Sequence, residues 1–292
     1  MSGNKYLTKI FKSFIYGSVP YFFTKIIKRE STNIQFYDYI RKHGYARHLY
    51  LFRHEYVDFK VNVLFDESKN LSYVLHHGKR LYVKRGFDTA KIKRMYKALV
   101  IEQDHRSAHR YFDSLDEVKG KTFLDIGSAE GMTSLDVVEL VDKIYLFECE
   151  TGWIEALNAT FEPWKDKVCI INKYINSFND ENNQTLDDFL KDKPTQNLFL
   201  KMDIEGFERH ALAGCTRLFS EAVNFSYAIC AYHLPDDEAV ISSFLNQYKS
   251  SYTLQKAYFA HKYRSIVFRG AQNKKQQSVF QGFLNNASVV NG

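Results

Sequence analysis

The sequence predicts an α/β fold with a seven-stranded, mostly parallel sheet that carries helices on both faces. Short apolar runs alternate with stretches of helical spacing from residue 120 onward, which is typical of parallel strands joined by crossover helices. The last two apolar runs have no helix between them and predict a terminal β-hairpin. The first run, at 122–126, leads directly into a glycine-containing turn, which is a third sign of this fold class.

Each strand and helix can be placed from its apolar spacing. The strands are expected at 122–126, 144–147, 168–171, 198–202, 227–231, 252–254 and 265–268. The helices are expected at 133–141, 152–161, 186–190, 207–218 and 237–248.

The chain ahead of this sheet follows other patterns. Residues 1 to about 50 are basic and aromatic with helical spacing, and Gly17 to Pro20 predict a break. Residues 57–83 alternate apolar and polar side chains around two turns, which predicts a small antiparallel meander. We therefore expect an N-terminal region at 1–98, a main domain at 99–272 and a C-terminal tail at 273–292.

The composition indicates which kinds of partner and which cellular compartment to expect. A net charge of +6 favours phosphate-bearing substrates or an anionic membrane surface, or it serves solubility alone. Four cysteines without a CxxC pair predict buried free thiols in a reducing compartment, hence the cytoplasm. The sequence contains no run of 18 apolar residues, so no membrane-spanning helix is expected.

Residues 5–29 mix lysines with large apolar side chains, so they make a poor secretory signal. This segment could form an amphipathic helix on the anionic inner leaflet, which would make the protein peripheral at the inner membrane surface. It could instead pack on the main domain or on a second subunit of a homo-oligomer.

The glycine turn is the sharpest local motif. A strand ends near Asp125, the chain turns at Gly127, and a helix opens after Gly131, where free N–H groups can face an anion such as a carboxylate. A dinucleotide site needs GxGxxG, and the spacing here is Gly-x-x-x-Gly after an acidic residue. Asp125 would repel a pyrophosphate, but it can hold an ammonium group or a water molecule. Ser128 and Glu130 lie inside the turn and belong to the expected site.

The next two strands supply further candidate ligands. Glu148 follows the second strand 21 positions after Gly127, the spacing of an acidic residue that binds ribose hydroxyls. Cys149 comes directly after it. Asn172 and Lys173 follow the third strand, in a loop that borders an adenine in such folds, although a plain surface loop is the alternative.

Carboxylates and a histidine follow the fourth and fifth strands. Asp203 and Glu205 lie beyond one strand end, and His233 lies beyond the other. Ligands of open α/β sheets bind outside the carboxyl ends of strands, so these side chains should share a crevice with Gly127 and Glu148. A histidine suits proton removal from a hydroxyl. The structural alternatives are that Glu205 caps the next helix and that His233 is a core residue.

Together these motifs resemble the FkbM family of methyltransferases. The chain reads Asp-Ile-Gly-Ser-Ala-Glu-Gly from Asp125, Phe-Glu at Glu148, and Lys-Met-Asp-Ile-Glu-Gly-Phe-Glu from Lys201, with Gly214 after it. The resemblance covers about 99–270 and implies a Rossmann-like class I fold that binds S-adenosylmethionine. Many members have Phe-Glu-Pro where this chain has Cys149, which should alter loop stiffness and leave the ribose contact intact.

A second signature lies just upstream. Residues 102–111 read Glu-Gln-Asp-His-Arg-Ser-Ala-His-Arg-Tyr, similar to FkbM-like proteins encoded with polysaccharide biosynthesis. This segment folds over the cofactor in class I methyltransferases. Glu102, Gln103 and His109 are therefore expected to contact the methionine part or the acceptor, the alternative being a solvated helix face.

The resemblance implies O-methylation of a sugar hydroxyl on a glycan or glycan precursor. His233 or Asp203 is the expected base, while Glu205 could instead orient the acceptor alone. Asp203, Glu205 and His233 could also hold a divalent cation that lowers the hydroxyl pKa. Small natural products or lipids are alternative acceptors, and a non-catalytic binding platform is a further alternative. The modest positive charge disfavours nucleic acid, and the glycine spacing disfavours a nicotinamide cofactor.

Overall fold

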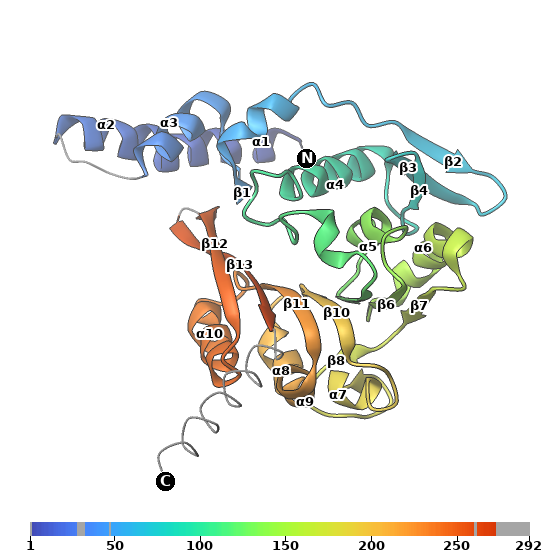
Figure 1. Ribbon diagram of the computed structural model, residues 1–292. Coiled ribbons are helices and arrows are strands. Elements are labelled where there is room, and N and C mark those ends of the chain that lie inside the picture. The colour runs from blue at the N-terminus through green and yellow to red at the C-terminus, as the bar shows by residue number, and fades with distance from the viewer. Residues whose placement is uncertain (1, 28–32, 47, 260–261, 273–292) are drawn as a thin grey trace, which may run out of the picture.

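The computed structural model describes residues 2–27, 33–46, 48–259 and 262–272 (Figure 1). The expected tail at 273–292 lies outside the described residues. Among the helices described, none combines the length and apolar character needed to cross a bilayer.

The main sheet has the strand order β1-β12-β13-β11-β10-β5-β6-β7. Five neighbouring strands from β11 to β7 run parallel, and the β12–β13 hairpin adds β13 antiparallel to β11, as the sequence predicts. The bounds are β1 His48–Leu49, β5 Thr122–Ile126, β6 Lys143–Phe147, β7 Val168–Ile171, β10 Gln196–Met202, β11 Val223–Cys230, β12 Ser251–Phe259 and β13 Lys262–Gln272. The two-residue strand β1 is an addition at the edge, too short to be predicted from spacing.

The chain leaves β5 toward β6 and β7 and later returns to β10 on the other side of β5. Loops diverge where the direction of winding reverses, which opens a crevice at the carboxyl ends of β5 and β10. Both faces of the sheet are covered. Along β5, Phe123 packs into one hydrophobic cluster and Leu124 packs into a second cluster on the opposite face. The sheet therefore carries a core on each side, as expected for helices on both faces.

Helices of the main domain flank this sheet (Figure 1). They are α4 Thr89–Glu102, α5 Met132–Val137, α6 Thr151–Phe161, α7 Leu186–Phe189, α8 Glu208–Ala213, α9 Thr216–Glu221 and α10 Asp237–Gln247, with 3-10 turns at η2 Leu51–Tyr56, η3 Leu115–Val118 and η4 Glu162–Trp164. A small parallel pair joins β8 Tyr174–Ile175 to β9 Asn183–Gln184.

The single helix predicted at 207–218 is wrong, because the chain forms α8 and α9 there. A Cβ on Gly214 would lie 2.2 Å from the carbonyl oxygen of Asn176, so this position needs glycine, a poor helix former. The Asp187 carboxylate then accepts the N–H groups of Arg217 and Leu218, at 2.8 and 2.9 Å, which gives α9 its own N-terminal cap.

The N-terminal helices do not break at Gly17 to Pro20, contrary to the prediction. The chain runs from α1 Ser2–Ser13 through a π-helical turn, η1 Phe14–Ser18, into α2 Val19–Ile26. Pro20 comes just after the π-helical turn, where the regular i→i−4 hydrogen-bond pattern is already interrupted, so the helix tolerates its missing N–H. The next helix, α3 Ile34–His43, packs against η1 and α2.

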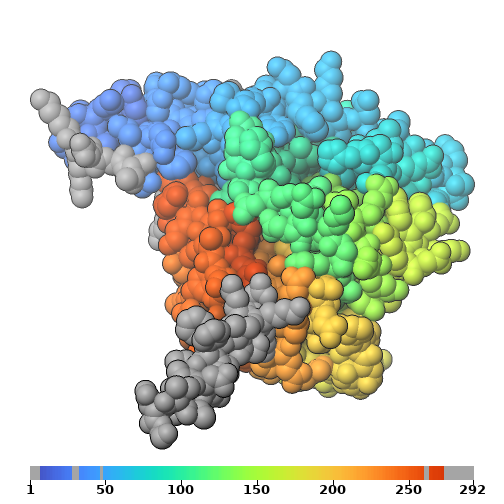
Figure 2. Space-filling model, in the orientation of Figure 1, coloured from blue at the N-terminus to red at the C-terminus, as the bar shows by residue number. Residues whose placement is uncertain are grey.

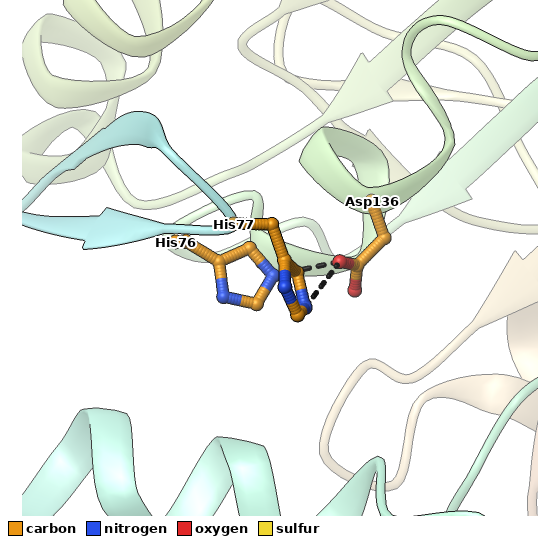
Figure 3. A group of neighbouring side chains, drawn as sticks. All are labelled: His76, His77 and Asp136. Carbon is orange, nitrogen blue, oxygen red and sulfur yellow. Dashed lines mark hydrogen bonds and ion pairs between the residues drawn. The ribbon is translucent and has the colours of Figure 1, made fainter.

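The predicted meander is confirmed as β2 Val63–Asp66, β3 Leu71–His76 and β4 Lys79–Tyr82. Figure 3 shows His76, the last residue of β3, and His77, in the turn between β3 and β4, facing Asp136 of α5. Nε2 of His76 lies 2.7 Å from Asp136 Oδ1, and its Nδ1 lies 2.9 Å from the Tyr96 hydroxyl of α4. Buried His76 thus joins the meander to two helices of the main domain.

The four cysteines are free thiols, as predicted. Cys215 and Cys230 are buried, but Cys169 is exposed, contrary to the prediction. Cys169 lies on β7, which is the edge strand of the sheet among the described residues.

Candidate functional site

A cleft of about 640 Å³ opens at the carboxyl ends of β5, β6, β10 and β11. Its walls combine the loops after these strands with the end of α4 and the segment that follows it. Among the residues expected to form the site, those that line the cleft are Glu102, Gln103, Gly127, Ser128, Glu130, Glu148, Cys149, Lys173, Asp203, Glu205 and His233. The expected residues His109, Asp125, Gly131 and Asn172 lie outside this lining.

The glycine turn has the backbone geometry that its sequence predicts. Gly127 has φ +79°, and a Cβ there would lie 2.0 Å from the carbonyl oxygen of Asp203. Gly131 has φ +82° and would place a Cβ 2.8 Å from Leu157 and Phe161 just as α5 begins. Both positions therefore require glycine, the first because the β5 and β10 loops touch and the second because α6 packs on the turn.

Asp125 supports this turn from the protein core and does not line the cleft. It is fully buried, with Oδ1 2.9 Å from Lys201 Nζ, and Oδ2 accepts a 2.6 Å hydrogen bond from the Ser134 hydroxyl. Lys201 Nζ also donates to the carbonyl oxygen of Gly127. Burial alone would lower the pKa of Lys201, but the Asp125 and Asp203 carboxylates outweigh it and raise that pKa. A buried ion pair thus holds the turn in place.

Two polar side chains of the turn point to a ligand. The buried hydroxyl of Ser128 makes no hydrogen bond within the part of the chain that the structure describes, although it lies in the cleft wall. Burial raises the pKa of Glu130 to about 7. Buried polar groups are normally satisfied, so the Ser128 hydroxyl fits a cleft that takes a polar molecule, and Glu130 adds a titratable group beside it.

Glu148 is oriented by the backbone around it. Its Oε2 accepts the N–H of Ala129 at 2.8 Å, and its Oε1 accepts the N–H of Glu150 at 2.7 Å. These bonds fix a carboxylate at the end of β6, where the remaining lone pairs can accept from a diol. Trp153 and Tyr174 also line the cleft.

Asn172 has a different place from the one expected. Its side-chain amide donates to the carbonyl oxygens of Glu148 and Cys149, at 2.7 and 3.2 Å. It therefore braces the loop after β6 instead of lining the cleft. Lys173, the next residue, does line it.

The far wall of the cleft brings together Asp203, Glu205 and His233, as expected. His233 Nε2 lies 3.5 Å from Asp203 Oδ1 and 3.5 Å from Glu205 Oε2. Its Nδ1 lies 2.9 Å from Oε1 of Glu208, a fully buried carboxylate that also accepts the N–H of Ile204. Glu205 has φ +56°, and its side chain is 91% exposed, so it lies at the mouth of the cleft.

Three carboxylates raise the pKa of His233. Burial alone would lower its pKa, but contact with Glu208 and the charges of Asp203 and Glu205 raise it above the ordinary 6.5. At this wall, potential metal-ligand atoms of Asp203, Glu208 and His233 lie within 4.8 Å of one another. The expected trio with Glu205 is thus replaced, in that compact group, by one with Glu208.

The segment at 102–111 folds over the cleft. Gln103 Oε1 accepts the N–H of Tyr111 at 3.2 Å, and the Tyr111 hydroxyl donates to Asp203 Oδ2 at 2.8 Å. His109 lies behind this wall, where its ring packs edge-on against Tyr232 with the centroids 4.9 Å apart and Nδ1 is hydrogen-bonded to Tyr50. His109 is therefore placed to support Tyr232, which does line the cleft.

Sequence reasoning did not select Tyr111, Lys201, Glu208 or Tyr232 as site residues. Each carries a signal in hindsight. Tyr111 ends the upstream signature, Lys201 and Glu208 bound the Lys-x-Asp-x-Glu-Gly-x-Glu motif, and Tyr232 directly precedes His233. Motif residues on either side of a candidate carboxylate are the ones that pack against it here.

Comparison with known proteins finds one family that matches part of the chain. Residues 176–256 match the family model of the methyltransferase FkbM domain, and this match contains the Lys201–Glu208 motif and His233. The resemblance to FkbM methyltransferases is thereby confirmed over this segment, which is under half of the chain and begins after the glycine turn and Glu148. Among curated proteins, no sequence matches significantly.

Several solved structures are similar to the chain at low identity. An FkbM methyltransferase from Methylobacillus flagellatus KT is 18% identical with a TM-score of 0.42, over 63% of this chain and 56% of that one. A Streptococcus mutans protein described as a methyltransferase, in complex with SAH, is 13% identical with a TM-score of 0.42, over 55% and 94%. An O-methyltransferase family protein from Burkholderia thailandensis is 11% identical with a TM-score of 0.41, over 64% and 60%. The chain thus spans little more than half of the first of these proteins.

Proposed function

We propose that the protein transfers a methyl group from S-adenosylmethionine to a hydroxyl of a sugar, on a glycan or a glycan precursor. The observation that carries the proposal is a single cleft with two chemically different walls. One wall offers the glycine turn and Glu148, and the other offers Asp203 and His233. A methyl donor and a hydroxyl acceptor can thus meet between a binding wall and a proton-accepting wall.

The first wall fits the cofactor. Glu148 would accept from the ribose hydroxyls, since its carboxylate is already fixed by two backbone N–H groups. The Ser128 hydroxyl, which has no partner among the described residues, and the buried carboxyl of Glu130 would face the amino-acid end. When bound, the cofactor supplies a methyl group already activated on a sulfonium.

The second wall accepts the proton of the acceptor. The oxygen gains a bond to carbon as the carbon–sulfur bond breaks, and its proton must leave. Above its raised pKa, His233 is a neutral base with a strong affinity for that proton, because three carboxylates stabilise the imidazolium. Asp203, held by Tyr111, would orient the hydroxyl beside Nε2.

The pH dependence of turnover tests this assignment. A base must be unprotonated, so we expect kcat/KM to rise with pH along a limb centred above 6.5, because the pKa of His233 is raised. In His233→Gln, this limb should be lost along with most of the activity. A limb at or below 6.5, or one that persists in the variant, would show that His233 is not the base.

Cofactor binding should release a proton from the Glu130 site. At pH 7, a carboxyl with a pKa of about 7 is about half protonated, and the ammonium group of a ligand beside it favours the ionised form. Titration calorimetry with S-adenosylhomocysteine in buffers of different ionisation enthalpy should therefore show release of about half a proton. Glu130→Gln is the control and should abolish the release; equal release in both proteins would assign the proton to another group.

A divalent cation at Asp203, Glu208 and His233 is the competing account of this wall. Both ring nitrogens of His233 face carboxylates, so the ring can interact with these carboxylates in place of a cation. We therefore expect turnover to survive EDTA. Loss of activity in EDTA that Mg²⁺ or Mn²⁺ restores would establish the cation instead.

Acceptor profiling tests the substrate class. Carboxylates at the mouth of the cleft, such as Glu205, accept from hydroxyl groups, and the Phe207 and Tyr232 rings offer apolar faces for a sugar ring. We expect radiolabelled methyl transfer to sugars, glycans or nucleotide sugars, and far slower transfer with Asp203→Asn. Transfer only to phenols or lipids would move the proposal to a natural product or lipid substrate. Failure with every acceptor, by a protein that binds S-adenosylhomocysteine, would favour a binding platform.

A further inference from the structure

The helical segment at 7–27 presents a broad apolar face to the outside. Ten large apolar side chains between Leu7 and Ile27 are exposed, each by 39% to 77%. Four of them are the phenylalanines Phe11, Phe14, Phe22 and Phe23, and we call the whole set the apolar face. In Figure 2, the N-terminal helices form the upper left edge of the molecule. Contiguous apolar surface of this kind marks a contact with a partner or a membrane.

The segment is anchored by its polar and small residues, which is the reverse of ordinary helix packing. Ser13 Oγ accepts the N–H of Tyr45 at 2.9 Å. A Cβ on Gly17 would lie 2.8 Å from the backbone nitrogen of Arg41, so α3 touches the segment at this glycine. The helix therefore uses its polar side to pack on its own chain and leaves the apolar side outward.

A contact with the sheet holds this arrangement. Phe36 of α3 stacks on Tyr258 of β12, with the ring centroids 4.8 Å apart. The apolar face is thus attached to the edge of the main domain through α3. Anything that binds this face also holds the cleft-bearing domain.

The positive charge of the segment indicates which kind of partner binds the apolar face. Residues 1–29 contain six lysines and arginines and no aspartate or glutamate. Lys9 and Lys25 are exposed within the segment itself. A second copy of the chain, paired face to face, would bring these positive charges together. An anionic lipid surface would attract them while its acyl chains take up the phenylalanines.

We propose that the apolar face binds the surface of an anionic lipid bilayer, with the helices lying in the plane of the interface. The inference rests on this surface alone and is independent of methyl transfer. Phenylalanines would insert at the boundary of headgroups and acyl chains, and lysines would face the headgroup charge.

Vesicle flotation of the full chain tests the proposal. We expect the protein to float with vesicles of phosphatidylcholine mixed with phosphatidylglycerol, and to bind phosphatidylcholine alone much more weakly. Added salt should weaken binding to the mixed vesicles, since it screens the lysines. Equal binding to both vesicle types, or none to either, would overturn the proposal.

A charged variant localises the contact. In Phe11→Glu, Phe23→Glu, we expect vesicle affinity to fall at least a hundredfold, on the basis of roughly tenfold for each buried phenylalanine. The matched control is Phe65→Glu, Leu75→Glu on the meander, where the side chains are 51% and 53% exposed. It should bind vesicles like the wild type, and circular dichroism melting should show that both variants fold.

A dimer is the outcome that would assign the face to a second copy. Light scattering of the lipid-free protein should give a monomer. If it gives a dimer that Phe11→Glu, Phe23→Glu dissociates while vesicle binding is unchanged, the apolar face is a subunit interface and the lipid proposal is wrong.

Discussion

Asp203→Asn should lower kcat by about a thousandfold while leaving S-adenosylhomocysteine affinity within a few-fold of wild type. Asparagine keeps the shape of the side chain and an oxygen that can accept a hydrogen bond from the Tyr111 hydroxyl. In the wild type, this hydroxyl lies 2.8 Å from Asp203 Oδ2. It removes the negative charge beside His233 Nε2, which makes the histidine a weaker base and the acceptor hydroxyl less well held. Steady-state kinetics and calorimetry on the same preparation measure both effects.

Tyr111→Phe provides the graded control for this prediction. It removes the hydrogen bond to Asp203 without removing a charge, so its effect on kcat should be much smaller than that of Asp203→Asn. The limb of the pH profile should also move to lower pH in Asp203→Asn, because one of the carboxylates that raise the pKa of His233 is gone. Turnover near the wild-type rate in Asp203→Asn would remove this residue from the reaction.

Lys201→Met should lower the free energy of unfolding by about 3–5 kcal/mol. The substitution leaves Asp125 charged and without its lysine in a fully buried position. It also removes the donor to the carbonyl oxygen of Gly127, so the glycine turn should loosen. Urea unfolding followed by circular dichroism measures the loss.

The double variant Asp125→Asn, Lys201→Met separates the cost of an unpaired charge from the cost of lost contacts. With both charges absent, the loss of stability should be clearly smaller than in Lys201→Met. A double variant as unstable as the single one would show that the ion pair contributes through its hydrogen bonds and packing instead.

Much of the main domain could be predicted because its signals are local. The strand at Thr122–Ile126 has the predicted bounds, since an apolar run bounded by a lysine and a glycine turn leaves little choice. Parallel pairing then brings the strand ends to one edge, which is why Gly127, Glu148, Asp203 and His233 share a cleft.

The errors in the fold arose where distant contacts override local spacing. Residues 207–218 have helical spacing throughout, but the chain divides at Gly214, because Asn176 approaches it closely and Asp187 caps α9. Neither partner is near in sequence. Gly17 was interpreted as a break, whereas it is the point at which α3 contacts a continuing helix.

The sequence predicts where the site lies better than it predicts which contacts each side chain makes. Asp125 was expected at the ligand, but a lysine that is 76 positions away neutralises it in the core. Tyr111 was not selected, because its contact with Asp203 spans 92 positions. Spacing shows which strand ends carry polar residues; it does not show which of them are satisfied by one another.

Calorimetric titration with S-adenosylhomocysteine tests the central claim most directly. We predict micromolar binding to the wild type and to Glu155→Ala, an exposed control on α6 that pairs with Arg85. Binding should be lost in Glu148→Ala, which removes the cleft carboxylate that we propose for the ribose hydroxyls. Absence of binding to folded wild-type protein, or full binding by Glu148→Ala, would contradict the assignment of this cleft to the methyl donor.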